Sequence, residues 1–414
     1  MLRAAALAEV GALDAPHSDH THDFNLFLRL AARYDIAFPG SALSLVRIHP
    51  EQDTETNFRA AAATGSLALA TELVDAAAYM CPWRSQWFGL PDRRREEVLA
   101  SADLLINVSG TLERPEAYRH IPRLAYIDSD PVFTQVRLAM DPGPFPALID
   151  RHDVHFSFGE TLAQADVTDN GHTWRPTHQP VVLAQWPVRV PARDVFTTVM
   201  SWTSYAALGF EGRSSGQKDV ELMKFVDLAG MVAPNVLEFA INEGMTDQSF
   251  PEYLDLPRRV RPTLEIALGS PNAPRTELTE RGWALRDPRA VSEDPWTYQD
   301  YIQRSKAEFS LAKHGYVVSA SGWFSERSAC YLATGRPVVL QDCAFSQWLP
   351  TGEGVLAFDT PQQAIACIEA VEGAYEFHCR KAREVAEASF DARAVLASLI
   401  ERAMQPSDRA APAS

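Results

Sequence analysis

The chain has 414 residues, of which 46% are hydrophobic, so it is long enough for two domains of ordinary size, each with its own core. Its formal charge of −16 argues against a nucleic-acid or anionic-membrane partner, because both need clustered cations. The five cysteines form no Cys-x-x-Cys pair and indicate neither a disulfide framework nor a metal site. Residues 1–10 are too short an apolar stretch for a signal peptide or a membrane span, so we expect a cytoplasmic protein.

The N-terminal part of the chain gives the weakest signal. Residues 34–38 and 43–48 have the composition of strands, and residues 58–80 have an alanine-rich helical pattern. No glycine-rich turn follows an early apolar strand, so whether residues 1–50 form a first βα unit stays open.

Two apolar runs, residues 103–108 and 124–127, are typical of buried strands. Asp128 and Asp130 follow the second run, which places them at the carboxyl edge of a predicted parallel sheet. Acids at such an edge can act as a base toward a hydroxyl group. The alternative is that Asp128 caps the turn or helix that follows.

A proline-rich stretch, residues 181–192, has no clear periodicity and is predicted to be a linker. It divides the chain into an N-terminal domain, residues 1–180, and a C-terminal domain, residues 193–405. The small, polar residues 406–414 are predicted to form a disordered tail.

The C-terminal domain begins with a β-branched strand over residues 196–200, which leads into Ser201 and Trp202. Lys218 stands near the start of the next helix, after a loop that contains glycine, and is a candidate phosphate partner. The alternative is a solvated lysine paired with Glu221.

The stretch from His314 to Phe358 carries the strongest pattern. A helix over residues 298–313 is predicted to lead into a strand over residues 316–319, and Ser321-Gly322 forms a turn after it. Ser325 is a helix N-cap, Gly335 ends that helix near Thr334, and residues 337–340 form the next strand. Thr360 with Gln363 predicts a further helix start.

The turn into the Ser325 helix suits a phosphate, since a helix N-terminus offers unpaired N–H groups and partial positive charge. Gly322 lets a ligand approach the backbone closely, and Arg327 in the first turn is unfavourable for the helix dipole unless an anion is nearby. Trp323 either stacks on a base or packs inside the protein. The alternative for the whole turn is an ordinary serine cap without a ligand.

The sequence from Tyr316 through Ser321, Gly322, Trp323 and Ser325 to the Gly335-Arg336-Pro337 segment resembles the donor site of GT-B glycosyltransferases. The resemblance implies an α/β fold of GT-B type, with two Rossmann-like domains whose parallel sheets face a cleft, and a nucleotide held by the C-terminal domain. The chain departs from the family where its histidine and asparagine fall on Ala320 and Phe324. The family's ribose-binding glutamate falls near Ser328 or Cys330.

The resemblance implies a nucleotide-diphosphate sugar as donor substrate, bound without a metal, and transfer of its sugar to an unidentified acceptor, with Asp128 or Asp130 as base. Two alternatives stay open: a non-catalytic nucleotide- or sugar-binding protein, and a sugar-nucleotide epimerase or hydrolase. The candidate donor contacts are Ser201, Trp202, Lys218, Ser321, Gly322, Trp323, Ser325, Glu326, Arg327 and Asp342.

Overall fold

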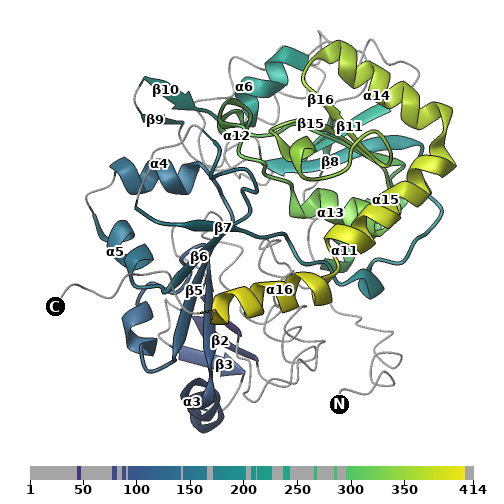
Figure 1. Ribbon diagram of the computed structural model, residues 1–414. Coiled ribbons are helices and arrows are strands. Elements are labelled where there is room, and N and C mark those ends of the chain that lie inside the picture. The colour runs from purple at the N-terminus through teal and green to yellow at the C-terminus, as the bar shows by residue number, and fades with distance from the viewer. Residues whose placement is uncertain are drawn as a thin grey trace.

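The computed structural model describes residues 44–47, 77–81, 86–89, 92–140, 143–165, 171–201, 207–210, 212–225, 236–242, 265–267, 284–286 and 295–405. Within these residues two parallel sheets dominate, and Figure 1 shows them in separate halves of the molecule. The strand order is β4-β5-β6-β7 in the first sheet and β11-β8-β14-β15-β16 in the second. The predicted α/β architecture with parallel sheets is therefore confirmed.

The first unit is the four-stranded sheet with its helices. Its strands are β4 (Leu104–Val108), β5 (Arg123–Asp128), β6 (Val154–Ser157) and β7 (Trp174–Pro176). Its helices are α3 (Asp92–Ser101), η1 (Pro115–Tyr118), α4 (Phe133–Met140) and α5 (Pro144–Asp150). Every residue of β6 is buried, and so is β5 from Leu124 onward, as expected for parallel strands covered on both faces. The two strands predicted here are confirmed.

The second unit is the five-stranded sheet with its helices. Its strands are β8 (Val195–Ser201), β11 (Val236–Asn242), β14 (Ala307–Ser310), β15 (Val338–Gln341) and β16 (Val355–Phe358). Its helices are α6 (Lys218–Leu222), η3 (Met223–Phe225), α11 (Pro295–Arg304), α12 (His314–Ser319), α13 (Glu326–Ala333), η5 (Phe345–Gln347), α14 (Pro361–Gly373) and α15 (Tyr375–Ser389). Helix α13 is buried along nearly its whole length and forms the centre of the core on one side of the sheet.

The last helix, α16 (Ala392–Met404), returns to the first unit and packs on β5, as Figure 1 shows. Leu399 and Ala403 of α16 join the core of that sheet. The chain thus crosses between the units twice, once near η2 (Leu183–Gln185) and once before α16. The sequence prediction had assigned residues 392–404 to the C-terminal domain, and this packing corrects it for that helix.

Three short sheets complete the described strands. In the first, β2 (Ala77–Cys81) lies between β1 (Ser44–Arg47) and β3 (Gln86–Gly89); in the other two, β9 (Leu208–Phe210) pairs with β10 (Arg213–Ser215), and β12 (Glu265–Ala267) pairs with β13 (Ala284–Arg286). A strand within residues 43–48 is confirmed, whereas residues 77–80 form a strand and not the end of the predicted helix. The strand predicted over residues 34–38 and the tail from residue 406 lie outside the described residues.

Two predictions around the central motif are wrong. The strand predicted over residues 316–319 is helix α12, and the helix predicted over residues 298–313 ends at Arg304, after which β14 begins. The helix after Ser325, the left-handed conformation of Gly335 and the strand that follows it are confirmed. The β-loop-α-β unit therefore exists, but its first strand is β14 and its loop contains a short helix.

Candidate functional site

The segments that follow β8, β14 and β15 leave the same edge of the second sheet, because these neighbouring strands are parallel. After β14 the chain forms α12, turns at residues 320–325 and enters α13. Helix α6 packs on α12 beside this path. The carboxyl edge of a parallel sheet is the usual place for a ligand in such folds.

Ser325 takes the N-cap position of α13, with φ −79° and ψ 137°, but its side chain makes no capping hydrogen bond. The first helical N–H with a partner is that of Ala329, which donates to Ser325 O at 3.0 Å. The three preceding N–H groups are those that every helix leaves unpaired. The predicted cap is therefore correct in position, while the Ser325 hydroxyl is left for another partner.

Among the described residues, several buried polar atoms without a hydrogen-bond partner belong to segments of the second unit on or near this edge of the sheet, and others occur elsewhere in the chain. Those near this edge come from β8, β14, the residue before α6, the turn into α13 and its first turn. They are Thr198 Oγ1, Gln217 Nε2, Glu308 Oε2, Ser321 Oγ, Ser325 Oγ and Ser328 Oγ. Because nearly all buried polar atoms in proteins are hydrogen-bonded, such a cluster favours a polar ligand at this place.

Lys218 begins α6 and is only 6% exposed, and its ammonium has no acceptor in the part of the chain that the structure describes. Burial lowers the pKa of Lys218 well below its usual value, and the Arg327 guanidinium acts in the same direction. The alternative of a solvated lysine paired with Glu221 is wrong, since Glu221 pairs with Lys224 and His314. A buried lysine of this kind favours a bound anion.

Arg327 lies beneath this site. Its Nε donates to Glu308 Oε1 at 2.6 Å, its Nη2 donates to Ser310 Oγ at 2.7 Å, and its Nη1 donates to Val199 O. Burial alone would lower the pKa of Arg327, but Glu308, Tyr298 and Glu326 together outweigh burial and raise that pKa above its usual value. The guanidinium therefore joins β8 to β14, and the expected direct contact between Arg327 and a phosphate does not fit this geometry.

The turn at Gly322 is pressed against the first unit. Thr161 donates from Oγ1 to Ala320 O at 2.7 Å and from N to Ser321 O at 3.3 Å. The N–H of Gly322 donates to Cys343 O at 2.7 Å and is not available to a phosphate. The left-handed Gly322, with φ +71°, thus permits a close approach by Thr161. The sequence analysis had expected a ligand to approach there instead.

Trp323 is half-buried, and one face of its ring is covered by packing within the protein. Its ring lies on that of Tyr316, with 4.5 Å between the centroids and 29° between the planes. Tyr316 in turn donates to Asp130, and Lys313 Nζ lies 2.9 Å from Asp130 Oδ1. These contacts join α12 to the carboxyl end of β5 and hold the two units together.

Asp128 is fully buried and accepts four hydrogen bonds. Three donors are side chains, Thr134 Oγ1 at 2.6 Å, Gln135 Nε2 at 3.1 Å and Ser157 Oγ at 3.0 Å, and the fourth is Asp130 N at 3.0 Å. Burial raises the pKa of Asp128. Asp128 therefore fits the alternative in which it caps a turn, and a role as base does not fit it. The side chain of Asp130, by contrast, is 30% exposed.

The remaining candidates lie near the same edge. Ser201 is the last residue of β8, and Trp202 lies outside the described residues. Glu326 is the first residue of α13 and is half-buried. Asp342 follows β15 and accepts from Ser346 N at 3.4 Å and from Ser346 Oγ, so it orders the turn there. Donor contacts by these residues stay predictions.

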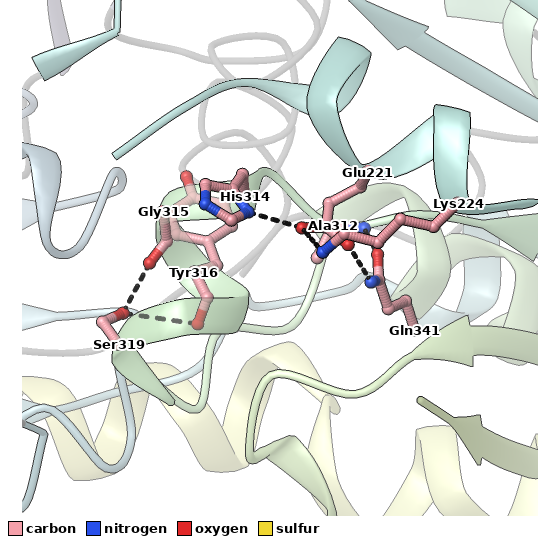
Figure 2. A network of polar contacts seen from close by, with 8 residues as sticks. All are labelled: Glu221, Lys224, Ala312, His314, Gly315, Tyr316, Ser319 and Gln341. Carbon is pink, nitrogen blue, oxygen red and sulfur yellow. Dashed lines mark hydrogen bonds and ion pairs between the residues drawn. The ribbon is translucent and has the colours of Figure 1, made fainter. Parts of the chain in front are cut away.

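The sequence analysis missed a polar network that Figure 2 shows beside α6 and α12. The carboxylate of Glu221 is wholly buried; its Oε1 lies 2.6 Å from His314 Nδ1 and 2.7 Å from Lys224 Nζ, and its Oε2 accepts from Gln341. These donors outweigh burial and lower the pKa of Glu221. The spacing of Glu221 and Lys224, three residues apart in the sequence, was the available signal.

Comparisons with known proteins agree with this architecture. No protein-family model and no curated protein sequence matches the chain. Among solved structures, Anabaena HepE in complex with UDP and glucose has a TM-score of 0.53 and 11% identity, covering 95% of this chain and 98% of HepE. HepE in complex with UDP-glucose has a TM-score of 0.53 and 12% identity, covering 94% and 97%. The chain has the GT-B fold. In a GT-B protein the two Rossmann-like domains correspond to the first and second units described above.

Among the helices that the structure describes, none combines the length and apolar character required to cross a membrane.

Proposed function

We propose that this GT-B protein is a glycosyltransferase that takes its sugar from a nucleotide-diphosphate sugar. The observation that carries the proposal is the buried Lys218 beside the unbonded hydroxyls at the start of α13. A diphosphate supplies both missing partners, because it brings negative charge to Lys218 and acceptor oxygens to Ser325 and Ser328. The likeness to HepE, which was solved with UDP and with UDP-glucose, supports the same class of ligand.

The chemistry that this site supports is electrostatic. When the bond between the sugar and the diphosphate breaks, negative charge develops on the leaving diphosphate. In this proposal Lys218, the first N–H groups of α13 and the Ser325 hydroxyl stabilise that charge, and the reaction does not require a metal. Arg327 holds β8 and β14 in place below them. Of the two predicted bases, Asp130 is the one that we retain for the acceptor hydroxyl.

A binding experiment tests the donor site. Thermal unfolding is measured with UDP, dTDP, GDP and ADP in turn, and a nucleotide at a hundred times its dissociation constant stabilises the fold by about 2.7 kcal/mol. Lys218→Met removes the buried ammonium and weakens binding roughly tenfold to a hundredfold. Lys381→Met is the matched control, because Lys381 lies on α15 and pairs with Glu353 and Glu384. Stabilisation of both variants to the same degree refutes the role of Lys218.

A turnover experiment separates the alternatives. The nucleotide sugar whose base binds is supplied with a labelled sugar, first alone and then with a mixture of sugar, phenol and lipid acceptors. Transfer of the label to an acceptor supports a glycosyltransferase, and release of free sugar supports a hydrolase. Conversion to another nucleotide sugar supports an epimerase, and binding without consumption supports a non-catalytic protein.

A further inference from the structure

A phenylalanine of the first unit is inserted into the core of the second. Phe133 is the first residue of α4, yet it is only 4% exposed and belongs to the hydrophobic core around α12 and α13. Its ring meets that of Tyr316 edge to face, with 5.6 Å between the centroids and 78° between the planes. Lys313 Nζ lies 4.9 Å from the centroid of the same ring. The side chain of Phe133 therefore anchors the first unit on α12.

Gly315 leaves the room that this ring occupies. It is a residue of helix α12, where alanine would be the better helix former. A Cβ at this position, however, would lie 2.7 Å from Phe133 Cζ and 3.1 Å from Ser215 Cβ. The ring of Phe133 and the last residue of β10 therefore both pack against this glycine.

The same glycine holds the chain segment that leads to Lys218. Its N–H donates to Gly216 O at 3.0 Å, and the N–H of His314 donates to Gln217 O at 3.3 Å. Both donors stand in the first turn of α12 (Figure 2). These bonds fix the two residues between the end of β10 and the buried Lys218, which begins α6. A displacement at the start of α12 is therefore passed on to Lys218.

A second contact between the units lies beside the first. Strand β9 pairs with β10 and packs on α4 (Figure 1), and Leu208 of β9 packs on Val132, Val136 and Leu162 of the first unit. Val132 directly precedes Phe133 and has φ +74°, a conformation that costs free energy for a residue branched at Cβ. Such a conformation persists only where the surrounding contacts impose it. The start of α4 is therefore held in a fixed position against β9 and α12.

We infer that Phe133 is a positioning residue of the donor site: it fixes Gly315 and, through the backbone hydrogen bonds of α12, the segment that presents Lys218. The inference rests on the proposed function and names a part that the first unit contributes to a site of the second. Phe133 acts here through Lys218 and not by contact with the donor. A segment that is already ordered binds the diphosphate more tightly than one that must be ordered on binding.

The test enlarges the glycine and then shortens the ring. In Gly315→Ala the added Cβ meets the ring of Phe133, so the segment before Lys218 is displaced and nucleotide binding is weakened roughly tenfold or more. Phe133→Leu removes the two ring atoms that this Cβ would meet. The double variant Gly315→Ala/Phe133→Leu is therefore expected to bind more tightly than Gly315→Ala. Affinities are measured by calorimetric titration of the full chain with UDP, dTDP, GDP and ADP.

Backbone hydrogen–deuterium exchange without nucleotide separates positioning from a general loss of stability. Peptides that cover residues 215–222 should exchange faster in Gly315→Ala than in the wild type, while peptides of α14 keep the wild-type rate. Phe133→Leu alone leaves space beside the glycine and should change the exchange of residues 215–222 in the same direction, so the inference is tested even if Gly315→Ala does not fold.

Gly373→Ala is the matched control. Gly373 ends α14, and no atom lies within 4 Å of the added Cβ. This variant should keep the wild-type nucleotide affinity and the wild-type exchange of residues 215–222.

The inference is overturned if residues 215–222 exchange at the wild-type rate in both Gly315→Ala and Phe133→Leu, or if the folded Gly315→Ala binds nucleotide as tightly as the wild type. Faster exchange in α14 as well, or a double variant that binds no better than Gly315→Ala, overturns it too. In each of these cases the proposed function stands, because the wild type still binds a nucleotide. If the wild type binds none of the four nucleotides, the proposed function falls, and the role of Phe133 in a donor site falls with it.

Discussion

Replacement of Gly322 by alanine is expected to loosen the contact between the two units. Gly322 has φ +71°, and a Cβ there would lie 2.5 Å from Thr161 Oγ1 and 2.7 Å from Thr161 N. Both Thr161 atoms are hydrogen-bonded, to Ala320 O and Ser321 O, so neither can withdraw without losing a bond that joins the units. The clash is therefore relieved only by moving the turn.

The expected loss of unfolding free energy in Gly322→Ala has two parts. A residue with a Cβ in the left-handed region costs about 1–2 kcal/mol, and forcing extra volume into a packed contact costs about 1–3 kcal/mol. Gly322→Ala should thus lower the free energy of unfolding by about 2–5 kcal/mol. Gly352→Ala carries only the first part, because Gly352 has φ +96° and no atom within 4 Å of the added Cβ.

Urea unfolding of the two variants measures the free-energy cost of the clash between the added Cβ and Thr161. The effect of alanine on the unfolded chain is the same in both and cancels in the comparison. The transition midpoint of Gly322→Ala should lie below that of Gly352→Ala by the equivalent of about 1–3 kcal/mol. If the two midpoints coincide, Thr161 moves away from the added Cβ at no cost in free energy, and the predicted clash is refuted.

Two further predictions concern stability away from the site. Burial lowers the pKa of His152 to about 4, so this histidine is neutral in the folded chain, and about 3 kcal/mol of stability present above pH 6.5 is lost as the pH falls toward 4. His152→Gln should lose less stability between pH 7 and 4 than the wild type, as measured by urea midpoints; an equal loss contradicts this. Thr360→Ala removes the capping box of α14 and should cost about 1 kcal/mol, whereas Thr111→Ala, which removes only a loop hydrogen bond at 3.1 Å, should cost less. A larger effect of the loop variant on the thermal midpoint would contradict the second prediction.

The sequence predicted the elements whose signals are local. The buried strand β15, the cap position of Ser325, the left-handed Gly335 and the capping box at Thr360 each depend on residues within a few positions of one another. Such signals can be read directly, because turn and cap chemistry is decided by neighbouring residues.

The misassigned segment around β14 depends on a partner far along the chain. Glu308 looks like a polar helix residue, yet it is buried in a strand because Arg327 pairs with it across 19 positions. The apolar run at residues 316–319 is too short to separate a helix from a strand by periodicity. Its helical form accompanies the contacts of Lys313 and Tyr316 with Asp130, which no local pattern indicates.

The sequence predicted the helix starts at Lys218 and Ser325 correctly, and a ligand beside them stays a proposal. Arg327 and Gly322, which were predicted as ligand contacts, serve the packing of the protein. The link between Glu221 and His314 spans 93 positions and could not be found without the fold.

The two chain crossings between the units run side by side. Val181 N donates to Phe390 O at 2.7 Å, and Ala392 N donates to Val181 O at 3.0 Å, so the outgoing and returning segments are bonded to each other. A double connection of this kind brings both links between the units to one place, so a rotation of one unit against the other would centre on it. The two units are therefore connected at residue 181, and the contacts of Asp130 and Thr161 join them at further points.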